Sequence, residues 1–282
     1  MKNKKKFGVL TIMAIITAMV FLSLSLAGCD NAVVSNIDTT FCTHTWVGGN
    51  ILVEPDCDEK GLQEQFCSDC GVEGQPKELR QKHVPHEDTG LCTECGDLAY
   101  YIGDTGPGGG IIYFRTQGGF TSYRTRTDTV GITAHYLECA PADMPEPLVW
   151  SLKSLASFEN YPIPGMTLEG TASVVSYPGT GLKNTLLILN TEPDAPAALA
   201  CYEYRAGGKD DWYLPSRAEL ELLFFYRIYN DHLNPIGELT KPNYWASSIV
   251  NEMNAWDYDL SNGDNNGRNR FNAFAVRAIR AF

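Results

Sequence analysis

The sequence predicts an α+β protein in which a small Cys/His module precedes a larger C-terminal domain. Three observations carry this prediction: short β-branched and aromatic runs, two segments with helical spacing between those runs, and a dense cysteine cluster near the N-terminus. The chain has 282 residues, of which 44% are hydrophobic, so one or two domains with a substantial core are expected.

The expected parts follow from shifts in composition along the chain. They are a lipoprotein signal peptide over 1–28, a lipidated tether over 29–40, the Cys/His module over 41–98, and the large domain over 99–282, with a variable C-terminal region over about 244–282.

The formal net charge is −12 and is unevenly distributed. Residues 41–97 hold 4 basic and 12 acidic side chains, whereas residues 100–282 hold 14 and 20. Recognition of phosphate or sulfate groups needs clustered Lys and Arg, so nucleic acids and sulfated polyanions are not expected partners.

The N-terminus has the features of a secretory signal. Basic residues occur between Lys2 and Lys6, an apolar run covers 7–24, and Leu26 to Cys29 reads Leu-Ala-Gly-Cys. This ending resembles the bacterial lipobox, which implies cleavage before Cys29, acylation of its thiol, and a membrane anchor in the cell envelope, on the cell surface or outer membrane. The alternative is an uncleaved anchor, because the run approaches the roughly 20 residues that cross a bilayer.

The module over 41–98 has too few apolar residues to fold on a hydrophobic core alone, so we expect a cross-link or metal. Two Cys-x-x-Cys-Gly units place paired thiolates where they can bind one ion. This pattern favours structural zinc. We predict one set of Cys42, His44, Cys67 and Cys70, and a second set of His83 or His86 with Cys92 and Cys95.

Disulfides are the competing interpretation of these cysteines, because an extracytoplasmic compartment is oxidising. Cys57 lies in an acidic turn and is left out of both predicted sets. The segment also resembles short Cys/His repeats of bacterial surface proteins, which implies a spacer without catalysis.

The large domain opens with a Gly-rich run over 103–110 that leads into Ile111–Phe114. The run lacks the Gly-Lys-Ser/Thr ending of a phosphate-binding loop and precedes β-forming residues, so we expect a turn between strands. A further strand is expected over 133–139.

Two helices are expected in the middle of the domain. The first covers about 194–206, after Pro193 and before a Gly-Gly pair. The second follows Pro215, where Ser216 and Glu219 form a capping box. Its apolar face should enter the core through Leu220, Leu223, Phe224 and Ile228.

The last forty residues combine short apolar strands with a polar segment. Strands are expected over 244–248, 255–260 and 275–282, and seven asparagines occur within the 22 residues from Asn251 to Asn272. Asn tolerates the left-handed backbone region and offers both a hydrogen-bond donor and an acceptor, so this segment suits recognition by a partner.

Four motifs of this domain resemble the domain that ends the Legionella collagen-like adhesin. They are Gly-Asp-Thr-Gly-Pro-Gly-Gly-Gly at 103–110, Asp-Trp-Tyr-Leu-Pro-Ser-Arg-Ala-Glu-Leu at 211–220, Tyr-Trp-Ala-Ser-Ser at 244–248 and Val-Arg-Ala-Ile-Arg at 276–280. The domain and its Asn-rich end are more closely similar to the Treponema variable lipoproteins, whose ends are rewritten by diversity-generating retroelements. The resemblance covers about 180 residues. It implies a C-type-lectin-like fold, shared with formylglycine-generating enzymes, with a variable binding face.

The composition of the variable segment provides a partial check. Adenine-directed mutagenesis of Asn codons never yields Lys, Glu, Gln, Met or Trp, and residues 257–274 contain none of these five. About three would be expected in this segment from the usage of these residues along this chain.

Strand alternation assigns the faces of the segment 255–260. Trp256 is expected in the core, which would turn Asp257 and Asp259 outward; Tyr258 would be exposed only if a bulge intervenes. The candidate ligand-binding residues are Asp257, Tyr258, Asp259, Asp264, Asn265, Asn266, Arg268, Asn269, Arg270 and Asn272. The alternative is an ordinary solvated loop.

The sequence contains no constellation typical of an active site, so an enzyme is not expected. His135 and His232 are isolated, and Cys139 and Cys201 are the only cysteines of the large domain. These two could form a disulfide or lie buried. The expected function is a surface-displayed receptor or adhesin for an extracellular protein or glycan. A glycan adhesin of fixed specificity, a formylglycine-type oxidase and a purely structural envelope protein are the alternatives.

Overall fold

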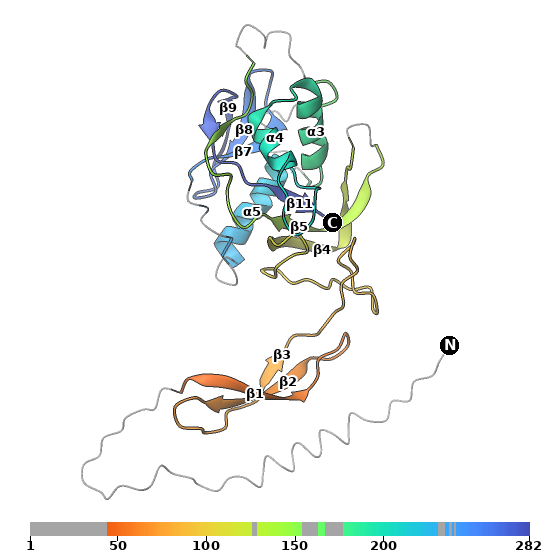
Figure 1. Ribbon diagram of the computed structural model, residues 1–282, viewed down its shortest axis with the longest axis vertical. Helices are drawn as coiled ribbons and strands as arrows, with labels where there is room; N and C mark the ends of the chain where they lie inside the picture. The colour runs from red at the N-terminus through yellow and green to blue at the C-terminus, as the bar shows by residue number, and fades with distance from the viewer. Residues whose placement is uncertain are drawn as a thin grey trace, which may run out of the picture. The chain divides into compact units, whose positions relative to one another are not determined.

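The computed structural model describes residues 44–125, 129–153, 163–166, 177–230, 235–236, 239 and 241–282. These residues form a mixed structure in which four sheets accompany three helices (Figure 1). The predicted signal peptide, the tether and Cys29 lie outside the described residues. Within the described ranges, no helix combines the length and the apolar character that a membrane span requires.

Contacts divide the chain into two units. One contains Met1–Thr45 with Ser68–Cys70, and the other contains Trp46–Cys67 with Gly71–Phe282. The second unit holds every helix and strand described below.

A small antiparallel sheet in the order β1-β2-β3 forms the first part of the second unit. Its strands are β1 (Trp46–Val53), β2 (Gly61–Cys67) and β3 (Lys77–Leu79). Nearly all of β1 is exposed or half-buried, and Trp46 and Ile51 are each 42% exposed. A sheet with so little buried apolar surface needs further stabilisation, as the composition of the segment predicts.

The C-terminal domain is built on two three-stranded antiparallel sheets and one strand pair. The first sheet has the order β11-β5-β4 and the second β7-β8-β9, while β10 pairs with β6. Their bounds are β4 (Ile111–Ser122), β5 (Ile132–Cys139), β6 (Leu148–Val149), β7 (Tyr244–Ile249), β8 (Asn254–Tyr258), β9 (Asn265–Asn269), β10 (Ala273–Phe274) and β11 (Ile279–Ala281). The strands predicted near 111, 133, 244 and 255 are confirmed.

The described residues of the domain include three helices: α3 (Gly181–Thr191), α4 (Pro196–Tyr202) and α5 (Arg217–Asn230). The helix predicted over 194–206 is shorter than expected and corresponds to α4. The prediction missed α3. The capping box of α5 is confirmed, because the Ser216 amide donates to Glu219 Oε2 at 2.7 Å and the Glu219 amide to Ser216 Oγ at 3.4 Å.

The predicted apolar face of α5 is only partly buried. Leu220 and Leu223 are fully buried and Phe224 packs at the edge of the core. The prediction for Ile228 is wrong: this side chain is 53% exposed, because the last turn of α5 carries it away from the core cluster that Leu220 and Leu223 enter.

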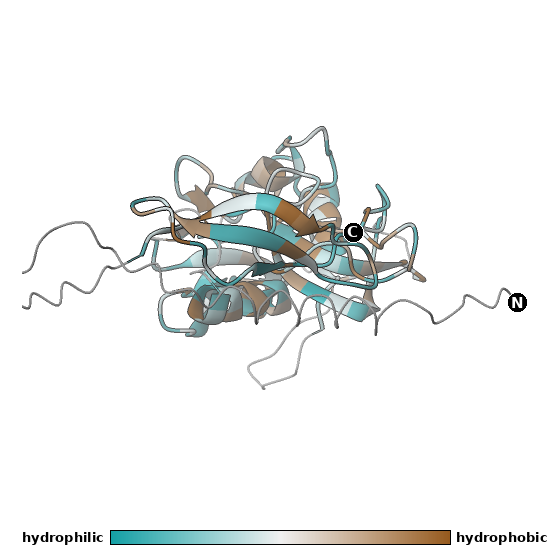
Figure 2. Cartoon of the chain, turned by 90° about the horizontal axis from the view of Figure 1, so that it is seen from below, coloured by the Kyte–Doolittle hydropathy of each residue, from teal (hydrophilic) through white to brown (hydrophobic). Residues whose placement is uncertain are grey.

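Two large hydrophobic clusters occupy opposite sides of the β7-β8-β9 sheet. Trp256 and Tyr258 of β8 belong to the cluster that includes Leu220 and Leu223 of α5. Ala255, the neighbour of Trp256 on β8, belongs to the cluster that contains residues of α3 and α4. The middle strand β8 is therefore covered on both of its faces. Figure 2 shows that the helices and strands carry both hydrophobic and hydrophilic residues.

Candidate ligand-binding face and metal centre

Three of the sequence motifs of the C-terminal domain meet at one buried guanidinium group, that of Arg280 on β11. Its Nη1 donates to Glu138 Oε2 at 2.9 Å, and its Nε and Nη2 donate to the two carboxylate oxygens of Asp211 at 2.7 and 3.0 Å. Glu138 also accepts from the amides of Gly108 and Gly110 at 3.1 and 2.7 Å. Arg280 thus links the Gly-rich turn, the Asp211 motif and the C-terminal strand.

Glycine is required in this turn because the chain approaches β5 closely. A Cβ atom on Gly110 would lie 2.2 Å from the carbonyl oxygen of Cys139, and one on Gly106 would lie 2.5 Å from the carboxylate carbon of Glu138. The Gly-rich run is thus a structural turn, as predicted, and its amides bind a carboxylate of the protein itself.

A neighbouring arginine of the same C-terminal motif is also buried. Arg277 donates from Nε to Asp143 Oδ1 at 2.6 Å and from Nη1 to the Ala140 carbonyl oxygen at 2.8 Å. Tyr244 at the start of β7 donates to the other Asp143 oxygen at 2.9 Å. Both arginines of the motif therefore stabilise the framework and are not available to a ligand.

The polar segment that follows β8 forms a hairpin with it. The two strands pair in register, with Asp257 opposite Asn266 and Ala255 opposite Arg268. The segment predicted as a loop is thus largely the strand β9. Asn has a low strand propensity, but the backbone ladder with β8 does not depend on side chains, and Gly263 has the positive φ of 86° that the connecting turn uses.

The candidate ligand-binding residues fall into three classes of exposure. Four side chains are exposed: Asp264, Asn266, Arg268 and Asn272. Three are half-buried: Asp259, Asn265 and Asn269. The remaining three are buried: Asp257, Tyr258 and Arg270.

The prediction that Asp257 faces outward is wrong. Its side chain is buried, Asn243 Nδ2 donates to its Oδ2, and Arg268 Nε lies 3.5 Å from its Oδ1. Alternation along a strand distinguishes core from solvent only if one face of the sheet is open. Because β8 is the middle strand between two apolar clusters, its polar position is enclosed as well. Burial raises the pKa of the Asp257 carboxyl group.

The predictions that Tyr258 and Arg270 contact a ligand are also wrong, because both side chains are buried. The Tyr258 ring is buried in the core cluster, with its centroid 5.9 Å from that of Phe224. The Arg270 guanidinium lies over the Trp150 ring, 4.5 Å from its centroid, and Nη2 donates to the Asn251 carbonyl oxygen at 2.9 Å. Because these two side chains are buried, they stabilise the hairpin and cannot contact an external ligand.

The two cysteines of the large domain are fully buried. Cys139 on β5 and Cys201 on α4 are both free thiols with no exposed surface. Burial raises the pKa of the Cys139 thiol to about 12, and burial also raises that of Cys201. The imidazole of His135 is in contact with the Thr116 carbonyl oxygen at 3.1 Å. Buried, protonated thiols are poor nucleophiles.

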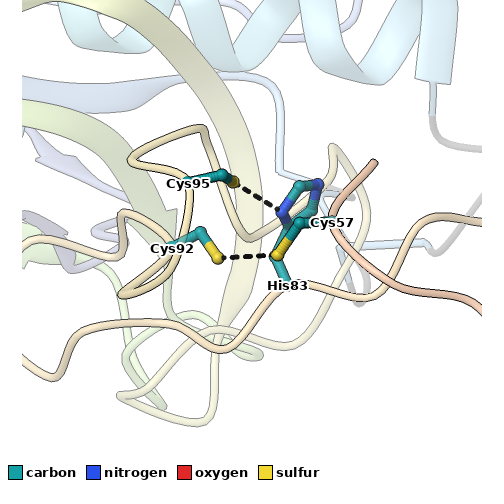
Figure 3. Close-up of side chains that lie close together, drawn as sticks. All are labelled: Cys57, His83, Cys92 and Cys95. Atoms are coloured by element: carbon teal, nitrogen blue, oxygen red, sulfur yellow. Dashed lines mark hydrogen bonds between the residues drawn. The ribbon is translucent and has the colours of Figure 1, made fainter. Parts of the chain in front are cut away.

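The structure brings four possible metal ligands together in the second unit: Cys57, His83, Cys92 and Cys95. Their ligand atoms all lie within 4.8 Å of one another. Figure 3 shows the four side chains pointing toward a common centre, with Cys57 Sγ 3.3 Å from Cys92 Sγ and Cys95 Sγ 3.4 Å from His83 Nδ1. Sequence reasoning missed Cys57, because it is 35 residues from Cys92 and belongs to no Cys-x-x-Cys unit.

His86, the alternative histidine of the predicted second set, is not part of this cluster. Its Nδ1 instead accepts from the Asp88 amide at 3.2 Å within a local turn. The choice between His83 and His86 is therefore resolved by geometry in favour of His83.

The environment of Cys92 favours the thiolate. Burial raises the pKa of this thiol, but amide donors at Cys95 and Glu94, together with the contact with Cys57, lower it to about 5. Amides turned toward the first sulfur are typical of a Cys-x-x-Cys-Gly turn. The Gly96 amide closes this turn on the Cys92 carbonyl oxygen at 2.9 Å, and Gly96 has a φ of 80°.

The first predicted metal set is only partly described. Cys42 lies outside the described residues. In the first unit, His44 Nδ1 lies 3.5 Å from Cys70 Sγ. Cys67 is buried at the end of β2, and its carbonyl oxygen accepts from the Gly71 amide at 2.9 Å, as that of Cys92 accepts from Gly96.

The large domain matches a known family model. Residues 142–280 match the model described as Lcl C-terminal domain. A comparison with curated proteins found no match. The crystal structure of a fimbrial protein from Bacteroides ovatus ATCC 8483 aligns with a TM-score of 0.39 at 12% identity, over 81% of this chain and 58% of that one. The chain therefore spans less than two thirds of the length of that fimbrial protein. Through residues 142–280, the chain is related to the Lcl C-terminal domain family.

Proposed function

We propose that this chain is a surface-displayed lipoprotein whose C-terminal domain binds an extracellular protein or glycan, as a receptor or adhesin. The observation that carries this proposal is the β8–β9 hairpin. Its buried residues are held by two apolar clusters, while Asp264, Asn266, Arg268 and Asn272 are exposed on it or just beyond it. Recognition residues commonly lie on exposed segments of a rigid scaffold. The match to the Lcl C-terminal domain supports the same role.

We assign the domain a C-type-lectin-like fold and a variable binding face, on the resemblance to retroelement-diversified lipoproteins. The separation of side chains supports this assignment. Exposed positions of the hairpin can change without cost to the core, whereas Asp257, Tyr258 and Arg270 cannot. Diversification would therefore act on the exposed and half-buried residues, namely Asp259, Asp264, Asn265, Asn266, Arg268, Asn269 and Asn272.

The membrane attachment in this proposal is the acylated thiol of Cys29, which would hold the protein on the cell envelope. Two or more acyl chains hold a protein stably on a bilayer, whereas one binds marginally. The lipobox-like ending before Cys29 supports this attachment.

A non-enzymatic function is part of the proposal. A formylglycine-type oxidase would need reactive cysteines that a substrate can reach. Cys139 and Cys201 have no exposed surface and burial keeps both thiols protonated, which does not favour that chemistry.

We also propose that the module over 41–98 holds structural zinc. Three thiols and one imidazole at Cys57, His83, Cys92 and Cys95 match the ligand types of closed zinc sites. Bound zinc would supply folding free energy that the small exposed sheet cannot supply itself.

The binding proposal is tested with the purified full chain in detergent. The chain is screened against printed glycans and a panel of extracellular-matrix proteins, beside a variant in which Asp264, Asn266, Arg268 and Asn272 are all replaced by Ala. We expect wild-type binding that the variant loses while its domain remains folded, with a modest loss of thermal stability because Arg268 lies 3.5 Å from the buried Asp257 carboxylate. Equal binding by both chains would contradict the proposed face.

A further inference from the structure

We infer that Cys57 is the fourth ligand of a closed tetrahedral zinc site with His83, Cys92 and Cys95, and that this site clamps the β1–β2 loop onto the segment 83–95. The inference rests on the proposed structural zinc and names the ligand that sequence spacing leaves out.

The four ligand atoms are close enough together to bind one ion, since all lie within 4.8 Å of one another. Zinc–sulfur bonds of about 2.3 Å in a tetrahedron place two sulfurs about 3.8 Å apart, and sulfur and imidazole nitrogen about 3.6 Å apart. The observed separations are 3.3 Å between the sulfurs of Cys57 and Cys92 and 3.4 Å between Cys95 Sγ and His83 Nδ1. A disulfide needs sulfurs about 2.05 Å apart, and Cys57, Cys92 and Cys95 are all free thiols.

Cys57 is held in position by the backbone around it. The Asp56 carboxylate accepts from the amides of Asp58 and Glu59 at 2.8 Å each, which fixes a tight acidic turn. The Lys82 amide donates to the Asp56 carbonyl oxygen at 3.0 Å, and Gln81 Nε2 donates to that of Cys57 at 3.0 Å. The residues next to His83 therefore bring Cys57 to the cluster.

The other two thiols are positioned equally well. The Cys92 amide donates to the Asp97 carbonyl oxygen at 2.7 Å, and the Thr93 amide donates to that of Val84 at 2.9 Å. The second bond joins the Cys-x-x-Cys turn to the residue that follows His83. Backbone carbonyls or amides at Cys57 and Cys92 and on both sides of His83 are thus held by hydrogen bonds that need no metal, and the Gly96 amide closes the turn that carries Cys95.

The ligand set also selects the ion. Thiolate and imidazole ligands favour zinc over hard cations such as calcium or magnesium. Four protein ligands fill a tetrahedral shell and leave no position for a substrate, so the site is structural. Its mechanical effect is to join two segments that are 35 residues apart, Cys57 and Cys92.

The test measures the zinc content of the full chain, purified in detergent without chelator, by mass spectrometry of the metal. The variants are Cys57→Ser and Cys57→His, and the control is His86→Ala, which changes a histidine of the same segment outside the cluster. We expect Cys57→Ser to lose about one zinc atom per chain, and Cys57→His and His86→Ala to retain it. Zinc retained by Cys57→His would show that Cys57→Ser loses zinc because a ligand is missing and not because the chain fails to fold.

The possible failures are distinguishable. Full zinc content in Cys57→Ser would overturn the role of Cys57 and leave the proposed zinc intact. A wild-type chain without zinc, carrying a Cys57–Cys92 disulfide in its peptide map, would overturn both. Neither result bears on the ligand-binding face, which is tested separately.

Discussion

Arg280 and Glu138 lie directly opposite one another on the paired strands β11 and β5, and Arg280 Nη1 donates to Glu138 Oε2 at 2.9 Å. Both side chains are buried, and the same guanidinium group also binds Asp211. The last strand of the chain is thereby attached to the Gly-rich turn that opens the domain.

Arg280→Met is expected to destabilise the domain strongly. It leaves the buried Glu138 carboxylate without its cationic partner and removes one of the two arginines that bind Asp211, the other being Arg124. Breaking a buried pair in this way costs about 3–5 kcal/mol. Chemical denaturation of the two chains measures the difference. The matched control is Arg205→Met, at an exposed arginine whose Nη1 donates to the backbone carbonyl oxygens of Tyr202 and Tyr204, for which we expect a change below about 1 kcal/mol. Equal effects of the two substitutions would contradict the assigned role of Arg280.

The stability that Asp211 contributes should depend on pH. Burial raises the pKa of Asp211, but the hydrogen bonds and charge of Arg280 outweigh it and lower the pKa below its ordinary value. An acid with a lowered folded-state pKa contributes stability above its unfolded pKa of about 3.9, and this contribution is lost as the pH falls through the folded value.

Asp211→Asn should therefore destabilise the domain at neutral pH, and the difference from wild type should shrink below about pH 4. Denaturation midpoints of both chains across about pH 3 to 7 measure this difference. A difference that is constant or grows on acidification would rule out the ion pair as its source.

Loss of the α5 capping box should have a moderate effect. Ser216→Ala removes the side-chain acceptor for the Glu219 amide in a fully buried position, and loss of an N-cap costs about 1 kcal/mol. Thermal unfolding of the variant measures the loss. Ser261→Ala, at an exposed serine of the hairpin turn, serves as the control and should change stability by less than about 0.5 kcal/mol.

The two thiols of the large domain should not react in the native protein. Cys139 and Cys201 have no exposed surface, and burial raises the pKa of both. Iodoacetamide followed by peptide mapping should modify them only after denaturation, while the exposed Cys70 and Cys95 react in chelator-treated protein. Native labelling of Cys139 or Cys201 would show that the domain opens more readily than this packing allows.

The sequence predicted those features of the fold that depend on local rules. The capping box at Ser216 and Glu219 and the strands near 111, 133 and 244 follow from spacing and propensity within a few residues. The existence of α3 is not predicted, although Gly181–Thr191 contains apolar residues at helical spacing. Its first turn begins with Gly181 and has no acidic residue, so Thr180 is a weak signal of its start.

The features that the sequence did not predict depend on tertiary contacts. The burial of Asp257 requires both faces of β8 to be covered, which alternation within one strand does not reveal. Cys57 joins its cluster because the Lys82 amide donates to the Asp56 carbonyl oxygen, which brings the acidic turn next to His83 although the two are distant in sequence. The sequence alone does not show that Arg270 is buried and Arg268 exposed, because the burial of Arg270 depends on its tertiary contact with the Trp150 ring.

The measurement that tests the central claim most directly compares two triple substitutions on the hairpin. One replaces the exposed Asp264, Asn266 and Arg268 by Ala, and the other replaces the buried Asp257, Tyr258 and Arg270 by Ala. Thermal stability and affinity for one immobilised glycan or matrix protein that the wild type binds are measured for both. We predict that the exposed set lowers affinity at least about tenfold, or about 1.4 kcal/mol, while the domain remains folded, whereas the buried set unfolds the domain. Unchanged affinity in the exposed set, or wild-type stability in the buried set, would contradict the account.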